Sequence, residues 1–181
     1  LPFQYDGIKV FFLRAIVFTR VGNQFMYGLI DLDNKILIAQ QYKNIYSIGS
    51  LRYAVENFEN KMALFTENGA QITPFTIDSI SAFKKNYAII HQGLRQGLID
   101  REGNIKMEPT YREIRIDDDG SVYARQTDEW MFLNGQNKMF SSKRADAVSA
   151  IGKDLLHVTT SEVVQIEDYT LKPLYPATFS S

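Results

Sequence analysis

The sequence predicts an all-β protein made of tandem repeats, each about 35 residues long with three to four short antiparallel strands. Two independent series of residues keep this period. The first series consists of branched apolar residues spaced by 37, 35, 34 and 34 positions: Ile8, Ile45, Ile80, Ile114 and Val148. The second consists of turn-forming residues spaced by 35, 34 and 34 positions: Asn34, Gly69, Gly103 and Asn137. Because both series share one period, the chain is a repeat array.

Each unit repeats the same order of short elements, which is clearest between residues 96 and 124. Residues 96–100 form a β-prone run, and Gly103 then marks a tight hairpin turn because glycine tolerates positive φ. The returning strand ends at Pro109, since proline cannot donate to a ladder. Ile114 and the Tyr123-Ala124 pair mark two further strands. No window shows a capped amphipathic helix, so the whole chain is predicted to be β.

We treat the chain as one repeat domain whose units begin on the run that precedes the hairpin turn. The expected units are residues 1–26 (partial), 27–61, 62–95, 96–129, 130–163 and 164–181 (partial and degenerate). One unit cannot bury both faces alone, so neighbouring units must stack. An open twisted array is favoured, and a five-bladed propeller completed by both termini is the alternative.

Composition narrows the possible partners and compartment. The chain has 45% hydrophobic residues and a formal charge of −1, without the basic run that nucleic-acid binding requires. No apolar stretch approaches the ~18 residues of a membrane span. The absence of cysteine excludes disulfides and thiolate metal sites. Because the chain opens on Leu1 rather than Met, we expect that a signal segment or a larger N-terminal part has been removed.

Polar motifs in the turns have structural interpretations. The segments Asp31-Leu32-Asp33-Asn34 and Asp100-Arg101-Glu102-Gly103 resemble calcium loops in their alternate carboxylates, but hairpin turns favour the same residues. Asp117-Asp118-Asp119 is read as a solvated loop. His91 and His157 lie on different units without a metal-binding partner, so both are expected to be ordinary strand or surface residues.

Aromatic residues are the feature that favours a binding function. The chain has ten Tyr, twelve Phe and one Trp, more than a small β core needs. Tyr53, Tyr87 and Tyr123 follow the repeat and are expected in the core. Tyr46 and Trp130 interrupt the repeat, so they are the predicted surface residues that bind a partner.

The recurring pattern resembles the bacterial WG repeat. The matching segments are Tyr27-Gly28-Leu29-Ile30-Asp31 and Gln96-Gly97-Leu98-Ile99-Asp100, with Trp130 at the aromatic position of its unit. The resemblance covers residues 2–173, although the Trp-Gly pair itself is nowhere intact. It implies a bacterial protein that is exported, whether periplasmic, outer-membrane-associated or extracellular.

Together these observations predict a non-catalytic scaffold module that mediates protein-protein interaction at the bacterial envelope or outside the cell. It would bind through Trp130 and Tyr46, without a cofactor, a metal or catalytic residues. The alternative is a carbohydrate- or peptidoglycan-binding module that uses the same surface. A hydrolase with an unrecognised carboxylate site is less favoured.

Overall fold

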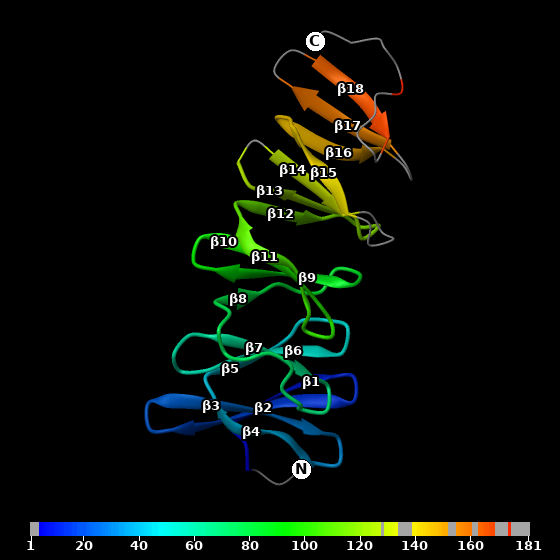
Figure 1. The fold of residues 1–181 in the computed structure, drawn as a ribbon. Coiled ribbons are helices and arrows are strands. Elements are labelled where there is room, and N and C mark those ends of the chain that lie inside the picture. Colours follow the sequence, from blue (N-terminus) through cyan, green and yellow to red (C-terminus); the bar gives the residue numbers. More distant parts are fainter. Residues whose placement is uncertain are drawn as a thin grey trace.

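The prediction of an all-β fold is confirmed. The computed structural model describes residues 4–127, 129–133, 139–151, 155–160, 163–168 and 174. Within these ranges the regular elements are the strands β1 to β18, and none is a helix. In particular, no described segment forms a helix that could span a membrane. Figure 1 shows the strands in small sheets that follow one another along a stack.

The described strands form five antiparallel sheets, in each of which neighbours in sequence are neighbours in space. The first sheet contains β1 (Gly7–Phe11), β2 (Arg14–Val21), β3 (Gln24–Asp31) and β4 (Ile36–Tyr42). The second contains β5 (Asn44–Ser47), β6 (Arg52–Glu56) and β7 (Met62–Thr66). The third contains β8 (Ser79–Ile80), β9 (Tyr87–Gln92), β10 (Arg95–Asp100) and β11 (Ile105–Tyr111). The fourth contains β12 (Glu113–Ile116), β13 (Val122–Arg125), β14 (Glu129–Leu133) and β15 (Met139–Arg144), and the fifth β16 (Ala147–Ile151), β17 (Leu155–Thr160) and β18 (Val163–Asp168).

Both periodic series occupy equivalent places in successive sheets. The apolar series falls on the first strand of every sheet, β1, β5, β8, β12 and β16. In the turn series, Asn34, Gly69 and Gly103 have φ of +66°, +82° and +87°. These are the left-handed conformations that a tight turn needs, so the turn prediction is confirmed at these three positions. The fourth position, Asn137, lies outside the described residues.

The sheets and the sequence units share a period but differ in phase. The aromatic-Gly run that opens a sequence unit forms the third strand of a sheet, as Tyr27 in β3, Met62 in β7 and Trp130 in β14 demonstrate. The hydrogen-bonded meander instead begins at the apolar anchor, two strands earlier. The opening segment therefore leads directly into the first strand of a complete four-stranded sheet.

The hydrophobic core is divided into clusters that lie between successive sheets. One cluster joins Ile16 and Leu29 of the first sheet to Ile45 and Val55 of the second. Equivalent clusters join the second sheet to the third, the third to the fourth, and the fourth to the fifth. Each sheet thus buries its faces against its neighbours, as expected for a solenoid-like repeat protein.

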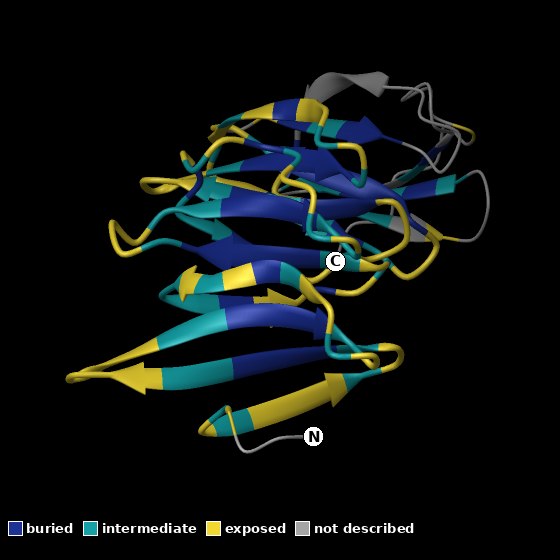
Figure 2. Ribbon diagram, turned by 90° about the horizontal axis from the view of Figure 1, so that it is seen from below, coloured by how far each residue is buried: buried dark blue, intermediate teal, exposed yellow. Residues whose placement is uncertain are grey.

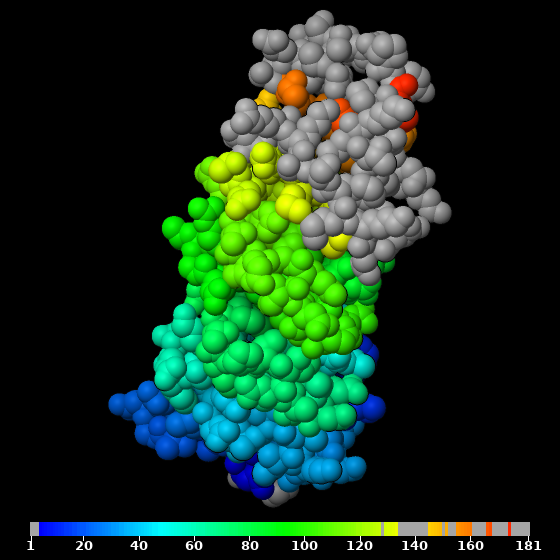
Figure 3. Space-filling model, viewed as in Figure 1, coloured from blue at the N-terminus to red at the C-terminus, as the bar shows by residue number. Residues whose placement is uncertain are grey.

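The stack is open, as the sequence predicts. The first and last sheets lie at opposite ends of the molecule and do not meet in a ring (Figure 1). In the space-filling view, consecutive segments of the chain form consecutive layers from one end towards the other (Figure 3).

Arginine side chains connect neighbouring sheets of the stack. Arg14, the first residue of β2, donates from Nε to the carbonyl of Glu67 at 3.0 Å. Arg52, the first residue of β6, donates in the same way to the carbonyl of Arg101 at 2.8 Å. Each guanidinium therefore holds a turn of the following sheet against the start of the second strand of its own sheet.

Candidate functional site

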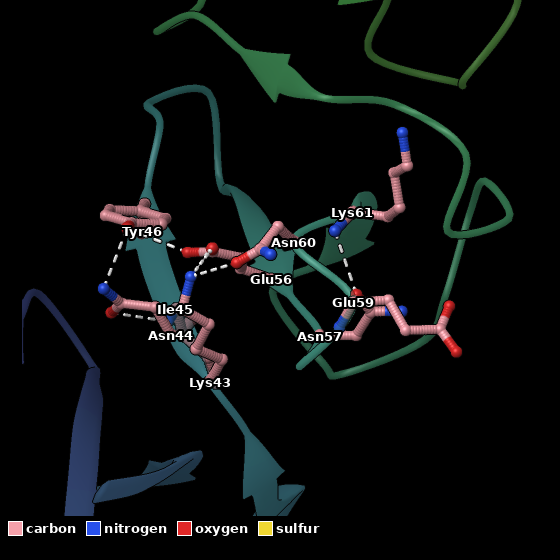
Figure 4. Close-up of polar contacts among 9 residues, drawn as sticks. All are labelled: Lys43, Asn44, Ile45, Tyr46, Glu56, Asn57, Glu59, Asn60 and Lys61. Carbon is pink, nitrogen blue, oxygen red and sulfur yellow. Dashed lines mark hydrogen bonds and ion pairs between the residues drawn. The ribbon is translucent and has the colours of Figure 1, made fainter. Parts of the chain in front are cut away.

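Tyr46, one of the two predicted binding residues, lies on β5 within a polar cluster (Figure 4). Its hydroxyl donates to Glu56 Oε2 at 3.2 Å and accepts from Asn44 Nδ2 at 2.8 Å. Glu56 is buried, and its Oε1 lies 2.6 Å from the ammonium of Lys43. The ammonium also donates to Asn60 Oδ1 at 2.5 Å. The network fixes the orientation of the Tyr46 side chain.

The aromatic ring of Tyr46 remains accessible, since the residue is 41% exposed. Burial raises the pKa of its phenol, and the neighbouring negative charge of Glu56 raises it further. Tyr46 therefore stays protonated in the neutral range and offers a ring face beside amide and carboxylate groups. The predicted surface position of Tyr46 is confirmed.

The predicted surface position of Trp130 is wrong. Trp130 is 7% exposed and belongs to the cluster between the fourth and fifth sheets. Its indole Nε1–H donates to the carbonyl of Ala145 at 2.9 Å, and the guanidinium of Arg125 lies 5.5 Å from the ring centre. The hydrogen bond lets the indole enter the core without leaving its N–H unsatisfied, so the ring is not available to a partner.

The three repeat tyrosines lie in the core, as predicted. Tyr53, Tyr87 and Tyr123 are 5%, 4% and 0% exposed. Each packs in a cluster between two sheets. Their periodicity therefore reflects sheet stacking rather than a row of surface aromatics.

His91 is a satisfied strand residue, as predicted. Its Nδ1 lies 3.0 Å from Ser79 Oγ, and its Nε2 lies 3.1 Å from Gln96 Nε2. Gln96 Oε1 accepts the amide of Ile114, so the amide nitrogen of Gln96 must donate to the imidazole. That assigns the imidazole proton to Nδ1, where it faces Ser79. His91 therefore links β8 to β10 through these hydrogen bonds and is not oriented to act as a base on Ser79.

The turn carboxylates bind backbone amides of their own turns. Asp31 Oδ1 accepts from the amides of Asp33 and Lys35, and Asp100 Oδ1 accepts from those of Glu102 and Asn104. This is the Asx-turn role rather than a calcium-binding role. The described residues hold no group of three His, Asp or Glu side chains placed to bind a metal.

The acidic run after β12 is also engaged locally. Asp118 lies 2.8 Å from the ammonium of Lys84, which lowers the pKa of its carboxyl. Asp117 pairs with Arg115 at 3.0 Å, and Asp119 accepts from the amide of Ser121. The three carboxylates have separate partners, in agreement with the predicted solvated loop.

An apolar groove lies between the first two sheets and has accessible apolar groups at its rims. Its volume is about 480 Å³. One rim is the β1–β2 turn, in which Phe12 is 93% and Leu13 66% exposed. The other rim is the β5–β6 turn, in which Leu51 is 59% exposed. The full lining is Phe11, Phe12, Leu13, Arg14, Ser47, Gly49, Ser50, Leu51, Tyr53 and Glu67.

Both rims have left-handed backbone at non-glycine residues. Phe12 has φ of +51°, and Ser50 and Leu51 have φ of +53° and +55°. Large side chains rarely adopt this conformation, because Cβ approaches the following carbonyl oxygen. Such strain concentrates at binding sites. In both exposed turns, a residue with a left-handed backbone, Phe12 or Leu51, thus also carries an exposed apolar side chain.

Sequence analysis missed this groove, although the sequence carries a signal for it. Aligning the units on their apolar anchors places Phe12-Leu13 at the hairpin position that Gly49-Ser50 occupies in the next unit. Apolar residues at a hairpin turn are unusual, since Gly, Asn and Asp dominate there. A turn-by-turn comparison would have identified Phe12 and Leu13 as surface candidates.

Fold and site together define an all-β tandem-repeat protein of stacked antiparallel sheets, with an apolar groove between its first two sheets. Within this class, residues 27–50 match the family model described as the WG containing repeat. The predicted resemblance to the WG-repeat family is therefore confirmed. The matched segment includes β4 and β5. No curated protein sequence matches the chain.

Several solved structures are similar in fold at low sequence identity. A eukaryotic initiation factor has 12% identity and a TM-score of 0.48, over 96% of this chain and 55% of that chain. BamB from Moraxella catarrhalis has 11% identity and a TM-score of 0.40, over 90% and 57%. The WD40 domain of Toxoplasma gondii coronin has 12% identity and a TM-score of 0.37, over 96% and 58%. This chain spans little more than half of each, and likeness at this level carries no argument about function.

Proposed function

We propose that the chain is a non-catalytic protein-binding module, and that its groove receives apolar side chains of a protein partner. The observation that carries the proposal is the exposure of Phe12, Leu13 and Leu51 around a single apolar cavity. Burying one such side chain in a complex contributes about 1.5–3 kcal/mol. A few clustered anchors of this kind supply most of the affinity in protein interfaces.

The polar groups of the groove support binding rather than hydrolysis. Glu67 is the one carboxylate among the lining residues, so the groove has no pair of acids for glycoside hydrolysis. The guanidinium of Arg14 is held by the Glu67 carbonyl at 3.0 Å and by Asn68 Oδ1 at 3.0 Å. Its donors therefore stabilise the stack. In line with the WG resemblance, we place this function at the bacterial envelope or outside the cell.

The test uses a displayed library of random linear peptides, selected on the chain and measured by fluorescence polarisation. Phe12→Gly removes the exposed ring and relieves the left-handed strain, so this variant should fold at least as stably as the wild type. We expect its affinity for selected peptides to fall at least tenfold. Leu94→Ser is the matched control, because Leu94 is 97% exposed on the β9–β10 turn, outside the groove lining. Equal binding by wild type and Phe12→Gly would overturn the proposal.

Carbohydrate binding remains the second candidate because of the Tyr46 cluster. An exposed tyrosine ring beside Asn44 and Glu56 combines the stacking face and planar polar partners that sugars use. Retention of the chain on insoluble peptidoglycan, lost in Tyr46→Ala but kept in Phe12→Gly, would support it. Absence of retention in the wild type would remove this candidate.

A further inference from the structure

The left-handed turns that form the rims of the groove have a third member in the next sheet. Phe12 and Leu51, on the two rims, have φ of +51° and +55°, and Lys85 in the β8–β9 turn has φ of +55°. All three residues are exposed, and Figure 2 shows this contrast between exposed turns and buried strand centres. The amide of Phe83, before the third turn, donates to the carbonyl of Ile48, before the second, at 2.7 Å. The third turn therefore adjoins the second rim of the groove, and it carries a cation where the rims carry apolar groups.

Two guanidinium groups connect this third turn to the groove. Arg52 Nη1 donates to the carbonyl of Leu51 at 3.2 Å, and Arg52 Nε donates to the carbonyl of Arg101 at 2.8 Å. Arg101 Nη2 in turn donates to the carbonyl of Lys85 at 2.9 Å. The apolar rim at Leu51 and the cation at Lys85 are thus parts of one continuous surface.

The charge of this surface changes between equivalent positions of successive sheets. Arg14 donates to the carbonyl of Glu67 beside the groove, and Arg52 donates in the same way to the carbonyl of Arg101 one sheet further. An acidic residue at the groove is therefore replaced by a basic residue in the next sheet. A ligand that leaves the groove in this direction passes from an apolar surface to a basic one.

Positive charge exceeds negative charge around Lys85. Asp118 is held by Lys84 at 2.8 Å, and Lys84 first and Lys85 second lower the pKa of its carboxyl. Among the described residues neither Lys85 nor Arg101 forms an ion pair, and Arg101 Nε is buried without an acceptor. The basic patch and its neighbouring acids are Arg52, Lys84, Lys85 and Arg101 against Glu102 and Asp118.

We propose that the partner presents an extended acidic segment, in which an apolar side chain fills the groove and a carboxylate about three to five residues away pairs with Lys85. This inference rests on the proposed function, since the groove supplies the apolar anchor. Stacked sheets lie ~10 Å apart and an extended chain rises ~3.3 Å per residue, so one sheet spacing corresponds to about three residues. The complementary charge sets the direction in which the segment lies on the stack.

Charge variants of the peptides selected on the wild-type chain test the inference by fluorescence polarisation. Each selected peptide is also synthesised with its acids replaced by Asn or Gln, and with its acids replaced by Lys. We expect an acid about three to five residues from the apolar anchor, and about three- to fivefold weaker binding of the neutral versions, the effect of an exposed ion pair. The difference should shrink in ~1 M salt, which screens exposed charges.

Lys85→Glu is the matching change in the protein. Lys85 is exposed, so the fold should stay intact, which circular dichroism verifies. We expect about tenfold weaker binding of the acidic peptides, because attraction becomes repulsion, and tighter binding of the Lys versions than the wild type shows. Arg95→Glu is the control, since it changes the net charge equally at the opposite end of the third sheet's hairpin and should bind like the wild type.

The outcomes separate this inference from the groove proposal. Equal binding of acidic and neutral peptides, or unchanged binding by Lys85→Glu, would overturn the acidic segment, while a loss in Phe12→Gly would still support the groove. Selected peptides without an acid at the derived spacing would also overturn it. Weaker binding in Lys85→Glu with no change in Phe12→Gly would instead refute the groove as the anchor site and the spacing measured from it.

Discussion

Gly103 is the position where a single substitution should separate the strain of the turn from the packing between neighbouring sheets. Its φ is +87°, and an added Cβ would lie 2.4 Å from Ile72 Cγ2 and 3.3 Å from Thr73 Cγ2. Left-handed backbone costs a non-glycine residue ~1–2 kcal/mol, and forcing apart packed atoms costs ~1–3 kcal/mol. For Gly103→Val we therefore expect the free energy of unfolding to fall by about 2–5 kcal/mol.

Gly93→Val is the matched control for this prediction. Gly93 also has a left-handed backbone, with φ of +59°, but no atom lies within 4 Å of its added Cβ. Only the strain of about 1–2 kcal/mol should appear there. Urea unfolding followed by circular dichroism measures both variants, at an unchanged denaturant slope. Equal losses would refute the packing contact with Ile72, and no loss in either variant would refute the left-handed turns.

Two further predictions concern the core and the acid stability. Trp130→Ala should lower the free energy of unfolding by about 3–5 kcal/mol. The substitution empties a buried site and removes the indole N–H that donates to the Ala145 carbonyl. A loss under ~1 kcal/mol, measured by urea unfolding, would contradict the burial of Trp130. For Asp100, burial raises the pKa, but hydrogen bonds from Asn104 and the ammonium of Lys106 outweigh it and lower the pKa. The ionised carboxylate thus stabilises the fold above the ordinary Asp pKa of about 4, and this contribution is lost as pH falls through the lowered value. Asp100→Asn should flatten the decline of the urea midpoint below pH 4, and an unchanged decline would exclude Asp100 as its source.

The fold was predictable because sequence signals that are weak in one unit recur in every unit at the same spacing. A single anchor such as Ile45 could lie in any strand, but five anchors at one spacing require one stacking position. The same reasoning placed Tyr53, Tyr87 and Tyr123 in the core, since a residue that repeats with the stack contacts the stack. The phase of the sheets was not visible, because the most regular motif belongs to the third strand while hydrogen bonding begins at the first.

The candidate site was less predictable, because a break in the repeat has two physical causes. Tyr46 breaks the pattern on a strand edge, where a ring reaches solvent and its hydroxyl reaches Glu56. Trp130 breaks it at a position where the fifth sheet and the Ala145 carbonyl accommodate a larger ring. Sequence alone does not distinguish these cases, since both appear as an aromatic residue at an irregular place.

A stricter criterion distinguishes a residue that serves a surface contact from a residue that fills the core. The criterion is an apolar residue at a hairpin turn whose backbone is left-handed. Stability offers no reason for Phe12, because glycine at this φ would avoid the strain and solvent surrounds the ring. Selection for folding alone would have removed such a residue, whereas selection for an interface would keep it. Trp130 fails the criterion, since its burial and its hydrogen bond account for it. The partner contact proposed for the groove would explain the exposed ring of Phe12, and replacement of Phe12 by glycine tests binding separately from folding.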